Sequence, residues 1–310
     1  MDMKTQRVGS IIKLIIWIAV LGILMSAFFM GFEEDGCLGN GIISLGGIRY
    51  DHPESYSVGN MEYSESVKNM DINWLSGSVK IATYEGSTVK VEETPVVEDE
   101  DERMRVKLEN GKLTVQYAAS GIGMINVSGK SLTIYIPRSD AEGQLGLVEL
   151  DDASSSVEIV GITASKLEID TASGGVDVKN SVIRDVEVDC ASSSVKLEGS
   201  FQRIDIDSAS GNATVIGEAS DITIDTASGD CIMQLTALPY AVDCDSASGD
   251  IMIEAPLGDG FRLDFDGGSG KAAVNLSDGS KLSGDKLTVG KGSASFKIDT
   301  ASGDFTFNEK

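Results

Sequence analysis

The sequence predicts an all-β fold: a β-solenoid of about eight to nine coils with an N-terminal β cap, preceded by a single transmembrane helix. Three observations predict it. A twelve-residue phrase occurs eight times between Val148 and Phe307, with copies starting 18 to 21 residues apart except for a last interval of 33. Apolar and polar residues alternate within each copy at the period of a β-strand. An uncharged run of nineteen residues lies near the amino terminus. A repeat period near twenty is typical of a solenoid, in which each coil covers the open face of its neighbour.

The first elements are a cytoplasmic N-terminus at residues 1–13 and a transmembrane anchor at residues 14–32. At about 1.5 Å per residue, the uncharged run is long enough to cross a hydrocarbon core of ~30 Å. Basic residues precede it and acidic residues follow it. We therefore expect a single-pass protein of the cell membrane, with its N-terminus cytoplasmic and its C-terminal domain outside. A cleaved signal peptide is the competing interpretation, although no small-x-small site ends the run.

Two regions lead from the anchor to the regular repeats. Residues 33–65 are rich in glycine and predict a linker with an entering strand. Residues 66–145 predict a β cap that contains a first, looser copy of the phrase beginning at Met70. Within the cap, Asn110 and Gly111 separate two alternating runs and indicate a tight hairpin. Because the end of a solenoid has to protect its exposed strand edge, a cap is expected at this place.

Residues 146–310 are the predicted solenoid repeats with a C-terminal closing coil. The first, third, tenth and twelfth residues of the phrase are apolar, so the inward parity changes in the middle and the chain turns there. The fourth residue is Asp in all eight copies and the seventh is Ser. Both side chains hydrogen-bond local backbone groups at bends. The last copy, Phe296–Phe307, has the bulkiest core residues and is expected to be the final coil.

Composition limits the partners. The chain carries 49 acidic and 25 basic residues, a formal net charge of −24. Nucleic acid and anionic lipid headgroups both need a basic surface, so we expect no nucleic acid partner. The four cysteines lack the paired spacing of metal sites, and Cys231 and Cys244 are expected to be buried structural thiols.

The Asp at the fourth position of the phrase is the candidate functional feature. If coils stack ~4.8 Å apart, these carboxylates form a ladder along one edge. Stacked like charges repel each other. Either each Asp caps its own corner by accepting backbone N–H bonds, which we favour, or Ca²⁺ lies between them. The Ca²⁺ candidates are Asp170, Asp189, Asp207, Asp225 and Asp245. A second, partial row is expected at Asp230, Asp250 and Asp304. No catalytic residue and no cofactor is predicted.

The residues also indicate a family. NWLSGSVKI from Asn73, the serial DTASGD corners and GKGSASFKIDTASGDFTF from Gly290 resemble the "putative adhesin" β-solenoid domain of bacterial envelope proteins. The resemblance covers Met61 to Phe307. It implies a protein held outside the membrane, and the family supplies no catalytic residues to carry over.

These observations predict a non-enzymatic, membrane-anchored, extracytoplasmic β-solenoid that serves adhesion or envelope interaction. Its partners would be the lipid bilayer, through the N-terminal helix, and a cell-wall polymer, a glycan or another envelope protein. The alternative is an accessory or sensor subunit of a cell-envelope stress response that docks a membrane partner. A glycan-active enzyme is less favoured, because acid–base catalysis needs two carboxyls in unlike environments and these repeat in like ones.

Overall fold

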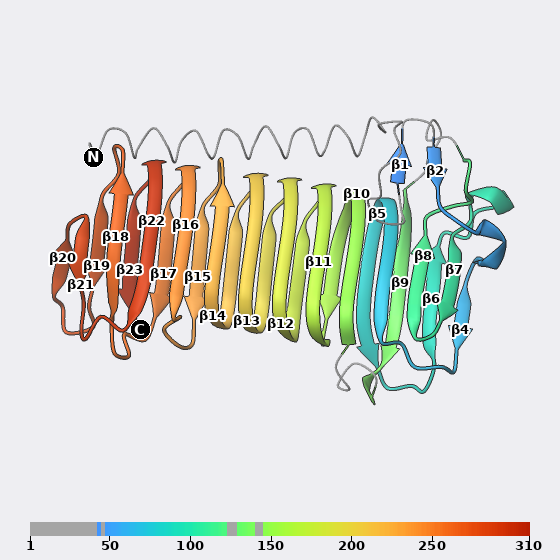
Figure 1. Ribbon diagram of the computed structural model, residues 1–310, viewed down its shortest axis with the longest axis horizontal. Helices are drawn as coiled ribbons and strands as arrows, with labels where there is room; N and C mark the ends of the chain where they lie inside the picture. The colour runs from blue at the N-terminus through green and yellow to red at the C-terminus, as the bar shows by residue number, and fades with distance from the viewer. Residues whose placement is uncertain (1–41, 45–46, 123–128, 140–144) are drawn as a thin grey trace.

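The computed structural model describes residues 42–44, 47–122, 129–139 and 145–310. They form an elongated stack of strands, with the blue-green cap at one end and the carboxyl end at the other (Figure 1). Nearly all regular structure in these ranges is strand, with two 3₁₀ turns, η1 (Pro53–Ser55) and η2 (Glu100–Glu102), so the all-β class is confirmed. The same ranges contain no helix that is long and apolar enough to span a membrane. The predicted anchor, residues 14–32, lies outside them.

The regular coils pair in parallel, copy against copy. Their strands are β10 (Leu145–Val160), β11 (Thr163–Ser173), β12 (Val176–Ser192), β13 (Val195–Ser210), β14 (Ala213–Thr226), β15 (Cys231–Leu235), β16 (Ala241–Ser248) and β17 (Ile251–Ala255). Val148 faces Leu167, which in turn faces Val186, so each residue pairs with the same position of the next copy. The predicted stacking of the phrase is therefore present.

The core is a continuous stack of aliphatic side chains between the two strands of each coil. The third-position residues Ile206 and Ile224 are fully buried, and the tenth-position residues of their copies face the same interior. At the corner between the two strands, some backbones approach too closely for a side chain. Gly211 has φ 124°, and a Cβ there would lie 2.0 Å from the carbonyl oxygen of Ser193. Glycine is required at this corner because the φ angle is positive and there is no room for a Cβ atom.

The cap covers the first coil. Its strands are β3 (Ser57–Val58), β4 (Met61–Tyr63), β5 (Asn69–Tyr84), β6 (Val89–Thr94), β7 (Arg105–Glu109), β8 (Lys112–Gln116) and β9 (Lys130–Pro137). Strand β5 is the looser first copy and pairs in parallel with β10 on one side and with β8 and β9 on the other. Strands β7 and β8 form the predicted hairpin, with Asn110 and Gly111 both at positive φ. A separate antiparallel pair joins β1 (Ile42–Ser44) and β2 (Gly47–Arg49).

The order of the last coils differs from the expectation. The strands are β18 (Phe261–Gly267), β19 (Ala272–Asn275), β20 (Lys281–Ser283), β21 (Lys286–Thr288), β22 (Ala294–Ser302) and β23 (Phe305–Glu309). The last copy, β22 and β23, pairs with β16 and β17 on one side and with β18 and β19 on the other.

The prediction that the last copy is the final, closing coil is therefore wrong. The chain passes over one coil position, builds the outermost coil with β18 and β19, and then returns to fill the gap (Figure 1). The antiparallel strands β20 and β21 lie against β19 and β18. The bulky Phe296 stacks on Phe261 and Phe307 packs against Phe261 at a tilt, so the rings of the last copy lie inside this end.

Candidate functional site: the acidic face

The fourth-position carboxylates lie in one line across the coils, so the predicted ladder is present. The register pairs Asp151 with Asp170 and Asp189 with Asp207, and it continues to the end of the stack. In spatial order the column is Asn73, Asp151, Asp170, Asp189, Asp207, Asp225, Asp245, Asp299 and Asp266. Asp299 precedes Asp266 because the last copy is inserted between two others.

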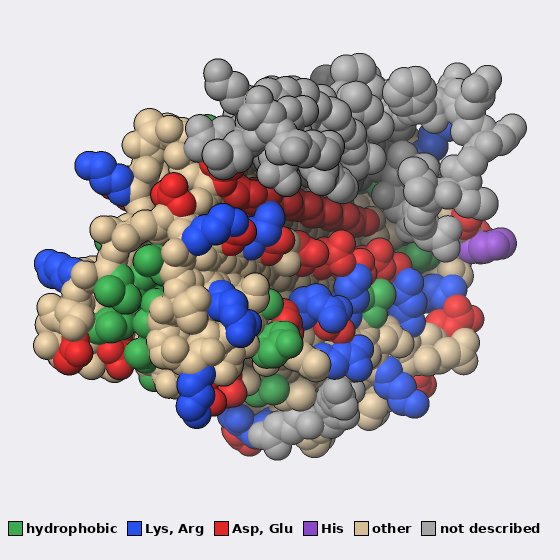
Figure 2. Space-filling model, turned by 60° about the vertical axis from the view of Figure 1, so that its left-hand side comes forward, with side chains coloured by type: hydrophobic (Ala, Val, Ile, Leu, Met, Phe, Trp, Pro, Cys, Tyr) green, Lys and Arg blue, Asp and Glu red, His purple; other side chains and the backbone are tan. Residues whose placement is uncertain are grey.

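A second acidic column runs beside the first, and sequence reasoning missed it. Because side chains alternate across a strand, the second and fourth residues of each copy point to the same side. In spatial order the second column is Asp71, Glu149, Glu168, Glu187, Asp205, Thr223, Asp243, Lys297 and Asp264. We call the two columns together the acidic face. Figure 2 shows acidic side chains in a continuous file along the coils, with basic side chains beside it. The signal was in the sequence, since most copies carry Glu or Asp at the second position.

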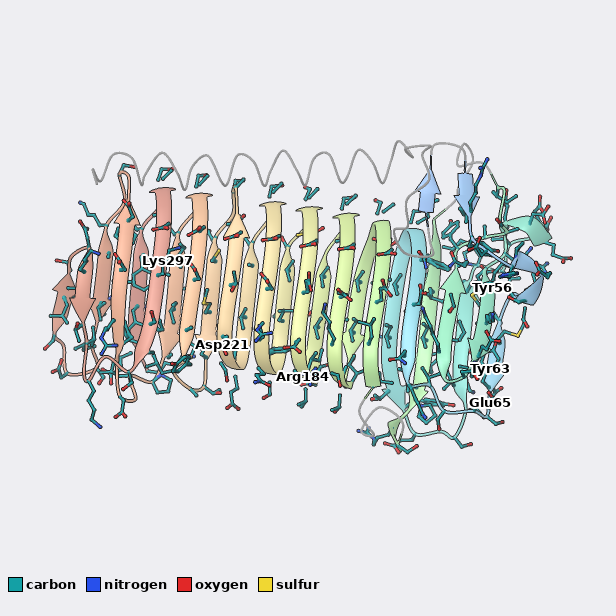
Figure 3. All side chains as sticks on the ribbon, viewed as in Figure 1. Tyr56, Tyr63, Glu65, Arg184, Asp221 and Lys297 are labelled. Atoms are coloured by element: carbon teal, nitrogen blue, oxygen red, sulfur yellow. The ribbon has the colours of Figure 1, made fainter. Side chains whose placement is uncertain are left out.

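Four lysines neutralise parts of this face, and one of them, Lys286, lies 2.9 Å from Asp264 at the outermost coil. Lys112 lies 2.6 Å from Asp71 at the cap end. Lys166 lies 2.6 Å from Glu168 and 2.9 Å from Glu187. Near the other end, Lys297 of the inserted strand β22 contacts the carboxylates at positions 243, 245 and 299 at 2.9, 3.6 and 3.3 Å (Figure 3).

The middle of the face carries negative charge without ion pairs. Within the described residues, Asp189, Asp205, Asp207 and Asp225 have no basic side chain within ion-pair distance. Arg184 and Asp221 lie towards one end of the strands, away from Lys297 (Figure 3). These four neighbouring carboxylates therefore lie together, without basic partners, at the centre of the stack.

Burial and mutual repulsion change the acidity of the column. Partial burial, followed by the charge of neighbouring carboxylates, raises the pKa of Asp151 and of Asp189 to about 7. The same two causes raise the pKa of Asp207 to about 6. The pKa of Asp245 is also raised to about 6 by burial, although Lys297 opposes the change. The face therefore changes its charge between about pH 5 and 8, inside the range that most cells and surfaces experience.

The capping role expected for the fourth position belongs to the ninth position instead. Asp230 Oδ1 accepts the backbone N–H of Asp250, and Asp250 Oδ1 accepts that of Asp304, both at 2.9 Å. Asp304 Oδ1 in turn accepts the N–H of Lys271 at 2.8 Å. Among the described residues, the fourth-position carboxylates of the regular coils accept no such bond. The ninth-position carboxylates thus join the corners of the later coils to one another, whereas the fourth-position column is left to face outward.

The five Ca²⁺ candidates all lie in the fourth-position column. In the described part of the chain, no group of three or more His, Cys, Asp or Glu side chains is arranged to hold a single metal ion. A ladder places its carboxylates in single file, whereas Ca²⁺ takes six to eight oxygen ligands around one point. Ca²⁺ at the five candidate Asp residues stays a prediction.

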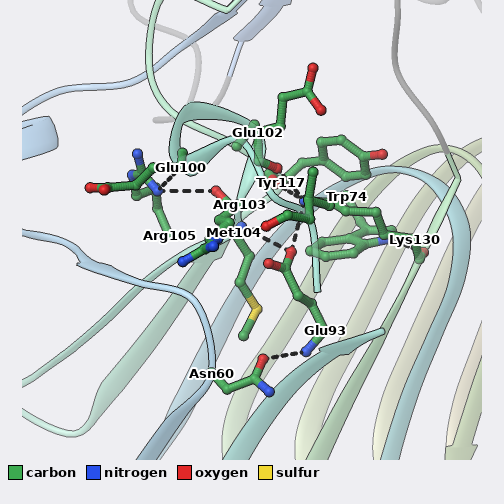
Figure 4. A network of polar contacts seen from close by, with 12 residues as sticks. Asn60, Trp74, Glu93, Glu100, Glu102, Arg103, Met104, Arg105, Tyr117 and Lys130 are labelled. Atoms are coloured by element: carbon green, nitrogen blue, oxygen red, sulfur yellow. Dashed lines mark hydrogen bonds and ion pairs between the residues drawn. The ribbon is translucent and has the colours of Figure 1, made fainter. Parts of the chain in front are cut away.

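A buried ion pair in the cap was also missed. Lys130 is 2% exposed and Glu93 1%, and Lys130 Nζ lies 2.9 Å from Glu93 Oε2. The ammonium group also donates to the carbonyl oxygens of Glu102 at 2.7 Å and Tyr117 at 2.6 Å (Figure 4). Its charge lies 4.1 Å from the centre of the Tyr117 ring, and Trp74 lies on another side. All three ammonium protons are used, so the group holds three cap segments together and has no proton free for chemistry.

Comparisons with known proteins fit this geometry. The family model described as Toastrack DUF4097 matches residues 67–308. Among solved structures, a putative adhesin from Bacteroides fragilis is 14% identical, with a TM-score of 0.48, and the match covers 82% of this chain and 97% of that one. A putative lipid binding protein from Parabacteroides distasonis is 16% identical, with a TM-score of 0.45 and coverage of 81% and 96%.

A third structure, a putative cell adhesion protein from Clostridium sporogenes, is 13% identical with a TM-score of 0.30, covering 82% of this chain and 100% of that one. At these identities and TM-scores, the likeness says nothing of ligand or activity. A search of curated proteins finds no match to this chain.

Proposed function

This chain belongs to the Toastrack DUF4097 family, and we propose that it is a non-enzymatic binding protein of the bacterial cell envelope. In this proposal Leu14–Phe32 anchors the chain in the lipid bilayer, and the solenoid is displayed outside the membrane in an adhesin-type role. The acidic face is the surface that meets the partner. That partner is a cell-wall polymer, a glycan or another envelope protein that presents positive charge.

The observation that supports this proposal is the double column of carboxylates with an unpaired centre. Asp189, Asp205, Asp207 and Asp225 stand on adjacent coils without basic partners. A partner with cationic groups at a similar spacing would relieve their mutual repulsion, and the field of the face would attract it from a distance. The surface also repeats along the stack, which suits an extended polymer or strand-like partner better than a compact small molecule.

The same geometry disfavours an enzyme. A catalytic pair of carboxyls needs two environments that separate their pKa values, so that one is an acid and the other a base. On this face, burial raises the pKa of Asp151 and Asp189 to the same value of about 7. Successive coils repeat one environment, and no His or Arg breaks the central part of the columns.

The location is tested by protease added to intact protoplasts. We expect the C-terminal domain to be digested without lysis, because the charges that flank Leu14–Phe32 place it outside. A cytoplasmic marker protein must stay intact in the same sample. Digestion that appears only after lysis would overturn the proposed location.

The binding surface is tested with polylysine as a cationic probe and with purified cell-wall material. The variant D189N/D207N/D225N removes three central charges from the face. Its control, E198Q/E218Q/E254Q, removes three charges from other parts of the coils. We expect the face variant alone to lose most of the probe binding, and wild-type binding to fall as salt is raised. Equal binding by the two variants would show that the face is not the docking surface.

A cross-linking experiment separates the adhesin role from the alternative. A photo-reactive side chain placed at Thr223, the uncharged position within the second column, reports what touches the face in living cells. Cross-links to wall polymer or surface glycan support adhesion. Cross-links to one membrane regulator would instead support an accessory or sensor subunit of an envelope stress response.

A further inference from the structure

Two thiols meet in the core of adjacent coils. Cys231 is the tenth residue of its copy and lies on β15, and Cys244 is the third residue of the next copy and lies on β16. Both side chains point inward and are buried, with 1% and 0% exposure. The Cys244 thiol interacts with Cys231, and both are free thiols in this structure.

These two positions are filled differently in the other coils. The preceding third-position residues Val188, Ile206 and Ile224 are aliphatic, and so are the tenth-position residues Val195 and Ala213. Aliphatic side chains satisfy this core, because its requirement is volume and apolar contact. Cysteine at both of two touching positions adds one capability that Val, Ile and Ala lack, which is a covalent bond between them.

We propose that Cys231 and Cys244 form a disulfide that ties the fifth regular coil to the sixth when the protein folds outside the membrane. This inference rests on the extracytoplasmic location in the proposed function, because cytosolic reductants keep such thiols reduced. The bond closes the segment 232–243, which contains the connection between β15 and β16 and the exposed Tyr240.

The reaction is a thiol–disulfide exchange with an extracytoplasmic disulfide oxidant, either a small disulfide or an exported thiol oxidase. One cysteine first attacks the oxidant as a thiolate and forms a mixed disulfide, and the second cysteine then displaces the oxidant. Two S–H bonds are lost and one S–S bond forms. The two electrons and two protons pass to the oxidant, which leaves as two thiols.

The order of events follows from the burial. The interaction with Cys231 and the burial of the site raise the pKa of the Cys244 thiol, so the folded core holds it protonated and unreactive. An oxidant also has no access to side chains with almost no exposed surface. The bond therefore forms while the sixth coil is closing, and a chain that folds without oxidant keeps both thiols.

The sequence offers a direct assay on the full chain. Trypsin releases one peptide, residues 204–262, that contains both Cys231 and Cys244 and no internal Lys or Arg. Cys190, a third buried thiol, lies in a separate peptide, 185–196. Cells are quenched with iodoacetamide in denaturant before digestion. We expect Cys190 to carry the label, and the 204–262 peptide to remain unlabelled and lighter than its reduced form by two hydrogens.

Reduction supplies the second readout. We expect reductant to lower the melting temperature of the solubilised wild-type chain by at least about 5 °C, from the loss of one short cross-linked loop. The C190A variant should respond in the same way. The C231A and C244A variants should melt at one temperature with or without reductant.

The outcomes separate this proposal from the one on which it rests. Label on both Cys231 and Cys244 in a protein whose domain is digested in intact protoplasts would overturn the disulfide and leave the location standing. Label on both in a protein that is protected in protoplasts would overturn the location and the cellular cross-link with it. In that second case, refolding the full chain with glutathione disulfide tests the pairing alone, and label on both cysteines there would overturn the pairing as well.

Discussion

At the scale of single residues, the buried Lys130 decides how the cap is held. Its charge is compensated by Glu93 and by the carbonyl oxygens of Glu102 and Tyr117. Removing one partner of a buried ion pair is strongly unfavourable, because the remaining charge stays buried without compensation. The pair therefore makes the positions of three cap segments depend on each other.

Removing one member of this pair should show that dependence. We expect Lys130→Met to reduce the free energy of unfolding by about 3–5 kcal/mol, because Glu93 is left buried and unpaired. The double variant K130M/E93L should recover most of the loss. The exposed pair Lys80–Glu158 is the control, and Lys80→Met should cost less than about 1 kcal/mol. Denaturant unfolding measures all three variants. Equal losses of stability for the two lysine variants would contradict the role of Lys130 in holding the cap segments together.

Sequence could not single out Lys130, although it predicted the β cap that contains this residue. A lysine at a strand start is normally solvated. Its acceptors come from residues 93, 102 and 117, which are brought together only by the antiparallel cap. The fourth-position Asp residues could be found because they repeat. Their outward direction was not foreseen, since Asp at a bend equally suits local capping.

At the scale of elements, the corners and the ladder divide two tasks that sequence reasoning had assigned to one residue. The ninth-position carboxylates hold adjacent corners in register through backbone N–H groups. The fourth-position carboxylates face outward and repel one another. Substitutions at the two positions should therefore have opposite signs.

We expect Asp250→Ala to lower the free energy of unfolding by about 1 kcal/mol or more, because the N–H of Asp304 loses its acceptor. Asp225→Asn keeps the shape of the side chain and removes a charge from the column, so it should be neutral or stabilising by less than about 1 kcal/mol. Denaturant unfolding at neutral pH and low salt measures both changes. A larger loss for Asp225→Asn than for Asp250→Ala would contradict this division.

The inserted copy makes the outermost coil dependent on the end of the chain. Strands β18 and β19 have their parallel partners in β22 and β23, and their remaining pairings are with the short strands β21 and β20. Truncation after Gly292 should therefore release residues 256–292 from the stack. Hydrogen exchange of Leu263 and Phe265 should become fast, while Ile206 stays protected. Removal of Lys310 alone is the control. Unchanged protection at β18 would contradict the insertion.

At the scale of the whole molecule, the repeat made the fold class predictable and left the order of the coils open. The period near twenty residues and the alternation within each copy are properties of one coil and its neighbour. Because the copies are so alike, the strand edge of any one copy could pair with that of any other, and the repeat does not determine the spatial order of the coils. The interval of 33 residues marked an irregular passage, but both a closing excursion and an insertion satisfy that length. The difference depends on packing among Phe261, Phe296 and Phe307, which is a tertiary property.

The acidic face should make the stability of the whole stack depend on pH in an unusual direction. Burial and like charges raise the pKa of Asp151 and Asp189 to about 7, and that of Asp207 to about 6. In the unfolded chain these groups return to about 3.9. Between these values the folded state binds more protons, so stability falls as pH rises from about 4 to about 7, and this contribution is fully present only below about 4.

Carboxylates that are paired with lysines set the lower limit of the pH range in which the fold is most stable. Lys80 and Lys179 lower the pKa of Glu158, so the contribution of Glu158 to stability is present above the unfolded pKa and is lost as the pH falls below about 4.

We therefore expect the melting temperature to be higher near pH 5 than at pH 8 by at least about 3 °C at equal ionic strength. Added salt should raise the value at pH 8 more than the value at pH 5, because it screens charges that exist only at the higher pH. The variant D151N/D189N/D207N should lose most of this dependence, while E198Q/E218Q/E254Q keeps it. A wild-type chain that melts lower at pH 5 than at pH 8 would show that the columns stay charged and that their repulsion is already relieved in the folded state.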